Sequence, residues 1–167
     1  MRRCCHELAA APLYRCPRNG DRPVPERGDD AVDIQCPCGA VQLRISSAPV
    51  AQFWCHCADC RRVHNAAYVG ESLYPAESVA VLSGETIAFT LRTTPRVSCA
   101  RCGSRLFADL TDIGMRGVSG TLLPEEAFDP QLHIHCREAV APVRDGLPHY
   151  QTKPVAFGGE DDAMMAW

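Results

Sequence analysis

Seven cysteines in three short groups constrain the fold of this 167-residue chain more than any other feature. The groups are Cys36 and Cys38; Cys55, Cys57 and Cys60; and Cys99 and Cys102. In a C-x-C pair on a strand, both side chains project from one face because the strand period is two. In a C-x-x-C pair the intervening residues turn the chain, so both thiols can reach one metal ion. Thiols within each group can therefore share an ion.

The first and last pairs predict a closed site of four thiolates. Gly39 and Gly103 each follow the second thiol of a pair, where a tight turn favours a positive φ. Zinc held by four cysteines is tetrahedral and has no vacant position. We therefore expect a structural ion that contributes on the order of 10 kcal/mol to folding.

The middle group predicts a different kind of site. Cys55, Cys57 and Cys60 can form a tripod on one tetrahedral ion and leave its fourth position to water or substrate, as in catalytic zinc sites. Arg61 and Arg62 follow at once. They can offset the charge of the thiolates and attract an anionic ligand, or simply form an exposed helical face.

Spacing alone leaves other arrangements open. All seven thiols can serve one binuclear structural site, or Cys36 and Cys38 can pair with two of the middle thiols. His56 or His64 can also close the middle site as a fourth ligand. Among the remaining cysteines, we expect free thiols near the N-terminus and a buried strand residue towards the other end: Cys4, Cys5, Cys16 and Cys136.

The distribution of turn and strand residues predicts a mainly β domain. Ten short segments with alternating or β-branched residues follow one another, separated by turn signals. They are Val32–Gln35, Ala40–Ile45, Val50–Trp54, Ala67–Tyr74, Val79–Leu82, Ile87–Thr93, Arg96–Ser98, Arg105–Ala108, Gly117–Thr121 and His133–Cys136. Helical character is limited to Ala58–His64 and a short turn at Pro124–Phe128.

Composition along the chain predicts three parts. Residues 1–30 are rich in proline, glycine and charge towards their end, so we expect a poorly ordered arm. A zinc-binding domain follows over residues 31–155, and residues 156–167 are expected to form a flexible tail.

The expected compartment is the cytoplasm. The first residues lack the apolar run of a secretory signal, and no segment has the roughly 18 apolar residues of a membrane span. Because the cytosol keeps thiols reduced, eleven cysteines favour metal binding over disulfides. The net charge of −3 and the scattered basic residues do not favour nucleic acid as a partner.

Three segments in order resemble the glutathione-dependent formaldehyde-activating enzyme family, which includes centromere protein V. They are C-P-C-G at Cys36–Gly39, F-W-C-H-C-A-D-C-R-R at Phe53–Arg62 and C-A-R-C-G-S at Cys99–Ser104. The resemblance runs from about Val32 to Tyr150 and ends on H-I-H at His133–His135 and D-G-L-P at Asp145–Pro148.

The resemblance implies a β-tent, built from small antiparallel sheets around two zinc ions. It assigns a structural zinc to Cys36, Cys38, Cys99 and Cys102, and an open catalytic zinc to Cys55, Cys57 and Cys60. It implies a carbon–sulfur lyase type of activity, which joins or separates the thiol of glutathione and formaldehyde. The chain departs from the family at His64-Asn65, where small residues such as Ser-Gly are common.

Two other functions remain open from the sequence. One is a non-catalytic, zinc-stabilised interaction module with both ions closed. The other is a redox or metal-storage protein in which the middle thiols oxidise or exchange metal.

Overall fold

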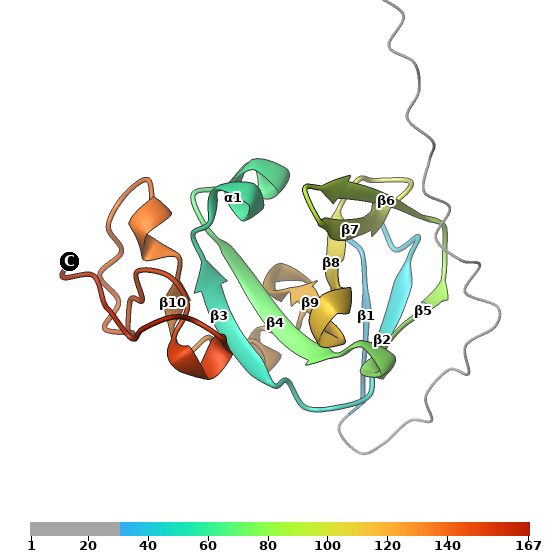
Figure 1. Ribbon diagram of the computed structural model, residues 1–167. Coiled ribbons are helices and arrows are strands. Elements are labelled where there is room, and N and C mark those ends of the chain that lie inside the picture. Colours follow the sequence, from blue (N-terminus) through green and yellow to red (C-terminus); the bar gives the residue numbers. More distant parts are fainter. Residues whose placement is uncertain (1–30) are drawn as a thin grey trace, which may run out of the picture.

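The structure is a computed structural model that describes residues 31–167. The expected arm, residues 1–30, lies outside the described residues together with Cys4, Cys5 and Cys16. The described chain is mainly β (Figure 1). Its strands are β1 (Val32–Gln35), β2 (Gln42–Ile45), β3 (Ala51–Cys55), β4 (Val69–Pro75), β5 (Val79–Ser83), β6 (Thr86–Leu91), β7 (Thr94–Cys99), β8 (Arg105–Leu110), β9 (Met115–Ser119) and β10 (His133–Ile134).

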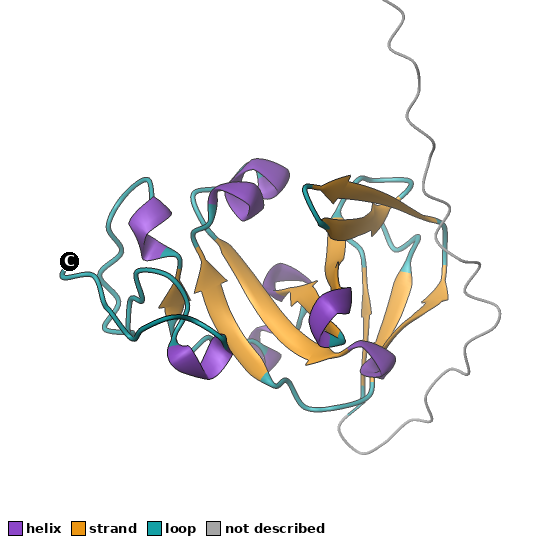
Figure 2. Ribbon diagram, in the orientation of Figure 1, coloured by secondary structure: helices purple, strands orange, loops and turns teal. Residues whose placement is uncertain are grey.

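Helical structure within residues 31–167 is short (Figure 2). The α-helix α1 spans Ala58–His64, as predicted. The 3-10 helices are η2 (Ala76–Ser78), η3 (Thr111–Ile113), η4 (Gly120–Leu122), η5 (Glu125–Ala127), η6 (Cys136–Glu138) and η7 (Val155–Phe157). None of these helices is long and apolar enough to span a membrane.

The strand predictions are confirmed, because each of the ten expected segments overlaps a strand. The last segment is shorter than expected. His135 has a φ of 57°, which ends β10 after Ile134. Cys136 therefore lies in η6, so its prediction as a strand residue is wrong, although it is buried as expected.

Two sheets of mainly antiparallel strands build the domain, which confirms the mainly β class and agrees with a β-tent. The smaller sheet has the order β1-β2-β5, and the larger has the order β10-β3-β4-β9-β8-β7-β6. The pairing of β10 with β3 is parallel, whereas the other strand pairs are antiparallel. One hydrophobic cluster joins both sheets, with members that include Ile34, Leu43, Val79, Val97, Phe107 and Val118.

The sheets place the cysteine groups in two separate cores. Cys36 and Cys99 belong to the cluster that joins the sheets, and both are buried. Cys55 belongs to a second cluster around β3, β4 and β10, against which Cys57 and Cys60 pack. The two groups of thiols therefore adjoin different hydrophobic clusters, and Cys38 and Cys102 of the first group are exposed.

The C-terminal stretch adds to the edge of the larger sheet at β10. The backbone N–H of Tyr150 donates to the carbonyl of His133 at 2.9 Å. The N–H of Met165 in turn donates to the carbonyl of His149 at 2.7 Å. The stretch expected as a flexible tail, residues 156–167, thus lies against this edge, where the ring of Trp167 packs 4.8 Å from that of His149.

Candidate metal centres

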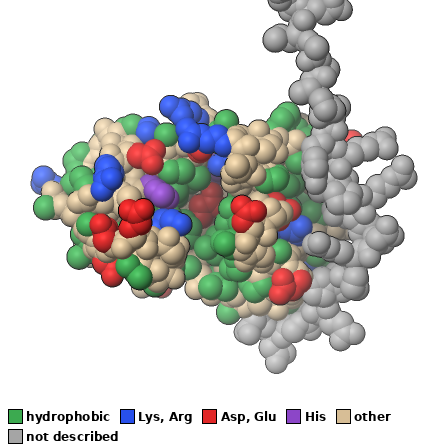
Figure 3. All heavy atoms as spheres, viewed as in Figure 1, with side chains coloured by type: hydrophobic (Ala, Val, Ile, Leu, Met, Phe, Trp, Pro, Cys, Tyr) green, Lys and Arg blue, Asp and Glu red, His purple; other side chains and the backbone are tan. Residues whose placement is uncertain are grey.

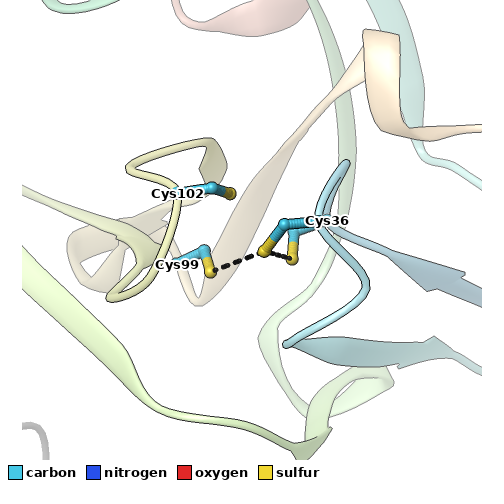
Figure 4. A group of neighbouring side chains, drawn as sticks. Cys36, Cys99 and Cys102 are labelled. Atoms are coloured by element: carbon cyan, nitrogen blue, oxygen red, sulfur yellow. Dashed lines mark hydrogen bonds between the residues drawn. The ribbon is translucent and has the colours of Figure 1, made fainter.

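Four thiols from two distant turns meet in the first cysteine group. Cys36 and Cys38 follow β1, whereas Cys99 ends β7 and Cys102 lies in the next turn, and the four sulfur atoms lie within 4.8 Å of one another (Figure 4). The Sγ atoms of Cys36 and Cys38 are 3.4 Å apart, and those of Cys38 and Cys99 are 3.8 Å apart. Tetrahedral zinc with Zn–S bonds of about 2.3 Å needs sulfur atoms about 3.8 Å apart, so the donors fit such an ion.

The two turns of this group are built alike. Gly39 and Gly103 both have a φ of 72°, as the sequence predicts for the residue after the second thiol. The N–H of Gly39 donates to the carbonyl of Cys36, and the N–H of Gly103 donates to that of Cys99, at 2.8 and 2.9 Å. Each turn therefore brings its two thiols close together and is closed by a local hydrogen bond.

Cys36 is held in the form that binds metals. Burial raises the pKa of this thiol, but the N–H of Val41, 3.3 Å from Sγ, and the thiol of Cys38 together lower it to about 6. The thiolate is the ligand form of cysteine. The described cysteines are all free of disulfides, as a reduced metal-binding group requires.

The second group lies where β3 runs into α1. Cys55 ends β3, Cys57 caps the N-terminus of α1, and Cys60 lies in its first turn. Their sulfur atoms lie within 4.8 Å of one another. The Sγ atom of Cys57 accepts the N–H of Cys60 at 3.3 Å. Hydrogen bonds from the thiols of Cys55 and Cys60 lower the pKa of Cys57, which makes it the thiolate of the three.

Neither of the two histidines considered as a fourth ligand joins this group. His56 turns its Nε2 to Nδ1 of His133 at 2.8 Å, and the Nε2 atom of His64 lies 3.9 Å from Oε1 of Glu71. Within residues 31–167, the second group therefore consists of three thiols. The grouping also separates Cys36 and Cys38 from the middle thiols.

A cavity of about 550 Å³ opens beside the second group, and its lining includes Cys55, Cys57 and Cys60. Figure 3 shows a hollow in this face of the molecule with hydrophobic, acidic and basic side chains around it. The apolar part of the wall includes Phe53, Leu73, Ile134 and Phe157. The charged part includes Asp59, Arg92, Arg96, Glu138 and Lys153. A ligand that enters this cavity meets thiols, apolar surface and charges of both signs.

Arg61 and Arg62 follow the second cysteine group in sequence, but they do not lie where they could contact a ligand in the cavity. Arg61 donates from Nε to the carbonyl of His56 at 3.0 Å, which ties α1 to the end of β3. The side chain of Arg62 is 69% exposed and lies 3.9 Å from Asp59. Neither arginine lines the cavity; its cationic residues come from β6–β7 and from the C-terminal stretch instead.

The turn after α1 accommodates Asn65, one of the two residues at which the chain departs from the family pattern. Asn65 has a φ of 50° and a ψ of 45°, the left-handed conformation that commonly ends a helix. Glycine adopts this conformation without strain, and asparagine tolerates it better than most other residues. The substitution therefore preserves the turn that follows the second cysteine group.

Glu71 is the functional candidate that sequence reasoning missed. It lies on β4, is 7% exposed and lines the cavity. Burial raises the pKa of its carboxyl to about 8, although Arg105 and Arg96 act in the opposite direction. Burial also lowers the pKa of His64 to about 4, so both side chains are neutral near pH 7. The available signal was a lone acidic residue inside an otherwise apolar and small-residue strand.

Replacing Glu71 with glutamine should remove part of the pH dependence of stability. The folded chain keeps the Glu71 proton up to about pH 8, whereas the unfolded chain releases it near pH 4.5. Between these values the folded state binds more protons, so its stability falls as pH rises. Urea unfolding at about pH 5, pH 7 and pH 9 measures this effect. From pH 5 to pH 9, the free energy of unfolding of Glu71→Gln should rise by several kcal/mol relative to that of the native chain, since one pKa unit is about 1.4 kcal/mol. Glu125→Gln, at an exposed glutamate of η5, is the matched control. An unchanged pH profile in Glu71→Gln would contradict the buried, neutral carboxyl.

The fold and the two cysteine groups define a mainly β domain whose thiols could hold metal ions. The chain belongs to the glutathione-dependent formaldehyde-activating enzyme family, because the sequence model of that family matches residues 31–138, more than half of its length. This membership connects the chain to the chemistry of glutathione and formaldehyde.

One solved structure similar to the chain is a crystal structure of a Rhodobacter sphaeroides protein, a structural-genomics target. It is 20% identical, and the alignment covers 56% of this chain and 89% of that one, with a TM-score of 0.47. No curated protein matches the chain.

Proposed function

We propose that the chain is a zinc-dependent carbon–sulfur lyase that forms or cleaves the adduct between glutathione and a small aldehyde such as formaldehyde. The observation that carries this proposal is the group of three thiols in the wall of a cavity, with no fourth protein ligand among the described residues. The family to which the chain belongs supplies the substrate class.

The two cysteine groups would hold zinc for different purposes. The four thiols of Cys36, Cys38, Cys99 and Cys102 would enclose a structural ion. The three thiols of Cys55, Cys57 and Cys60 would leave one position of a second ion facing the cavity. A zinc ion in the second group would lower the pKa of a substrate thiol that coordinates it.

The cavity offers complementary contacts for a tripeptide thiol. Glutathione carries two carboxylates, and Arg92, Arg96 and Lys153 place positive charge on the wall. The guanidinium of Arg96 is held by Nη1 hydrogen bonds to the carbonyls of Leu91 and Thr94, at 3.2 and 3.0 Å. Its position is therefore set before a ligand arrives, which lowers the entropy cost of binding.

Glu71 would supply the proton that adduct formation needs. As the sulfur of the thiolate bonds to the carbonyl carbon, the π electrons of the C=O bond move to oxygen. The neutral carboxyl of Glu71, which lines the same cavity, would give its proton to this oxygen and regain one from solvent. In the cleavage direction the carboxylate takes the hydroxyl proton as the C–S bond breaks.

Native mass spectrometry of the full chain, with and without glutathione, tests the proposal. We expect one zinc ion in each of the two cysteine groups and one retained glutathione. Cys57→Ala should lose one ion and the glutathione, because only two thiols remain in the second group. Cys136→Ala is the matched control: this cysteine is also buried but belongs to neither group, so both ions and the glutathione should stay.

Exchange between free formaldehyde and its glutathione adduct, followed by ¹³C exchange spectroscopy, measures the chemistry. Glu71→Gln should slow the catalysed exchange by about 100-fold or more while glutathione binding is kept, as for loss of a general acid. Two ions without any retained glutathione would contradict the open site. Glutathione that stays bound in Cys57→Ala would contradict the assignment of the site to the second cysteine group.

A further inference from the structure

A third group of potential metal ligands lies outside the cysteine centres. It consists of His133 on β10, and Asp145 and His149 in the segment that follows η6. None of the three lines the cavity, although Ile134, the residue after His133, does so. Any role of this group is therefore separate from the proposed function and does not rest on it.

The three side chains converge on one point. Nε2 of His133 is 2.7 Å from Oδ2 of Asp145, and Nε2 of His149 is 3.4 Å from Oδ1 of the same carboxylate. The two imidazole rings stack with centroids 4.4 Å apart and planes at 26°. Both Nε2 atoms face the carboxylate of Asp145. Tetrahedral zinc with bonds of about 2.0–2.1 Å places nitrogen and oxygen ligands about 3.3 Å apart. Small movements would bring these three atoms to that spacing.

The surroundings of His149 support binding of a ligand at this point. The residue is only 8% exposed, and its Nε2 atom, although it lies 3.4 Å from Oδ1 of Asp145, is buried without a hydrogen bond. A buried polar atom without a hydrogen bond reduces the stability of the folded state by about 1–3 kcal/mol. Most buried polar atoms in native structures are therefore hydrogen-bonded. A cation held jointly by this atom, Nε2 of His133 and the Asp145 carboxylate would satisfy it.

Neighbouring groups hold the three ligands in place, as is usual around metal sites. Nδ1 of His133 faces Nε2 of His56 at 2.8 Å, which fixes the plane of the His133 ring. Oδ1 of Asp145 accepts the N–H of Leu147 at 3.1 Å, and Trp167 packs on His149. The side chain of Asp145 is 34% exposed, so an ion can reach the group from solvent.

We propose that His133, Asp145 and His149 form a third metal site, which binds one divalent transition-metal ion of the Zn²⁺, Co²⁺ or Fe²⁺ class. Imidazole nitrogen suits these ions, and a set of two histidines and one carboxylate is a known ligand combination for them. Hard cations such as Mg²⁺ and Ca²⁺ prefer oxygen ligands and should not compete.

Cobalt titration of the purified full chain, with metal counted by native mass spectrometry, tests this site. We expect one ion per chain beyond those held by the cysteine groups. The extra ion should add weak d–d bands without new sulfur-to-cobalt charge-transfer absorption, because its ligands are nitrogen and oxygen. That signature separates it from binding by thiols elsewhere, including Cys4, Cys5 and Cys16.

Two substitutions locate the ion. His149→Gln and Asp145→Asn should each weaken binding of the extra ion by at least about 10-fold and leave the ions of the cysteine groups unchanged. His64→Gln, at a histidine outside the group, is the matched control and should keep the extra ion. Circular dichroism checks that each variant is folded.

A second measurement uses the native chain alone. In ¹H–¹⁵N spectra of the histidine side chains, added zinc should shift Nε2 of both His133 and His149. The proposal is overturned if no extra ion binds, if its absorption shows thiolate ligation, or if either ligand variant binds it as tightly as the native chain.

Discussion

Replacing Cys102 with serine is expected to unfold the domain at room temperature, although the side chain of Cys102 is exposed. An exposed substitution usually changes stability by no more than about 0.5 kcal/mol. If this four-sulfur group holds zinc, loss of one thiolate would remove most of a metal contribution on the order of 10 kcal/mol. Domains of this size are stable by only about 5–15 kcal/mol, so the remaining interactions are insufficient.

Circular dichroism and zinc content of the purified variants measure this effect. Arg101→Ser changes an exposed residue in the same turn and should leave both the fold and the metal content intact. A strong chelator added to the native chain should reproduce the unfolding seen in Cys102→Ser. If Cys102→Ser still melts cooperatively within a few degrees of the native chain, the first cysteine group does not hold a structural ion.

The second large effect is expected for Gly84→Ala, in the turn between β5 and β6. Gly84 has a φ of 92°, and a Cβ atom there would lie 2.0 Å from the carbonyl oxygen of Ala40 and 2.7 Å from Cα of Val41. These are backbone atoms directly after the turn that holds Cys36 and Cys38, so they cannot move aside without shifting the metal-binding turn. We expect a loss of about 3 kcal/mol or more in the free energy of unfolding, together with weaker metal retention.

Gly114→Ala separates backbone strain from this clash. Gly114 also has a positive φ, of 63°, but a Cβ atom added there would have no heavy atom within 4 Å beyond its own chain neighbours. The variant should lose only about 1–2 kcal/mol, the cost of a left-handed conformation for a residue with a side chain. Urea unfolding of both variants gives the comparison. Equal losses would show that the close approach of Gly84 to Ala40 is not what constrains this turn.

Much of the fold was predictable because its signals are local. Alternating or β-branched residues located the ten strands of residues 31–167, and the helix Ala58–His64 was found with the bounds seen in the structure. Strand ends were harder to predict. The end of β10 depends on the positive φ of His135, a conformation that the residue type alone does not specify.

The sequence by itself determined which thiols lie near each other within a group. In C-x-x-C and in the glycines that follow each pair, turn geometry acts over a few residues, so the spacing is sufficient. Gly39 and Gly103 adopt the predicted conformation for this reason. Cys36 and Cys38 lie in a turn after β1 and not on a strand, so the strand period expected for C-x-C is not what brings these two thiols together. The likeness of these segments to a known family also pointed to the chemistry of the site.

Only the tertiary structure decided which distant groups meet and which side chains surround them. Spacing allowed His56 to close the second group, but packing of β10 against β3 turned it towards His133 instead. Likewise, the proton held by Glu71 and the unpartnered nitrogen of His149 both result from burial. Burial depends on contacts between segments far apart in the chain, and short-range sequence patterns do not predict those contacts.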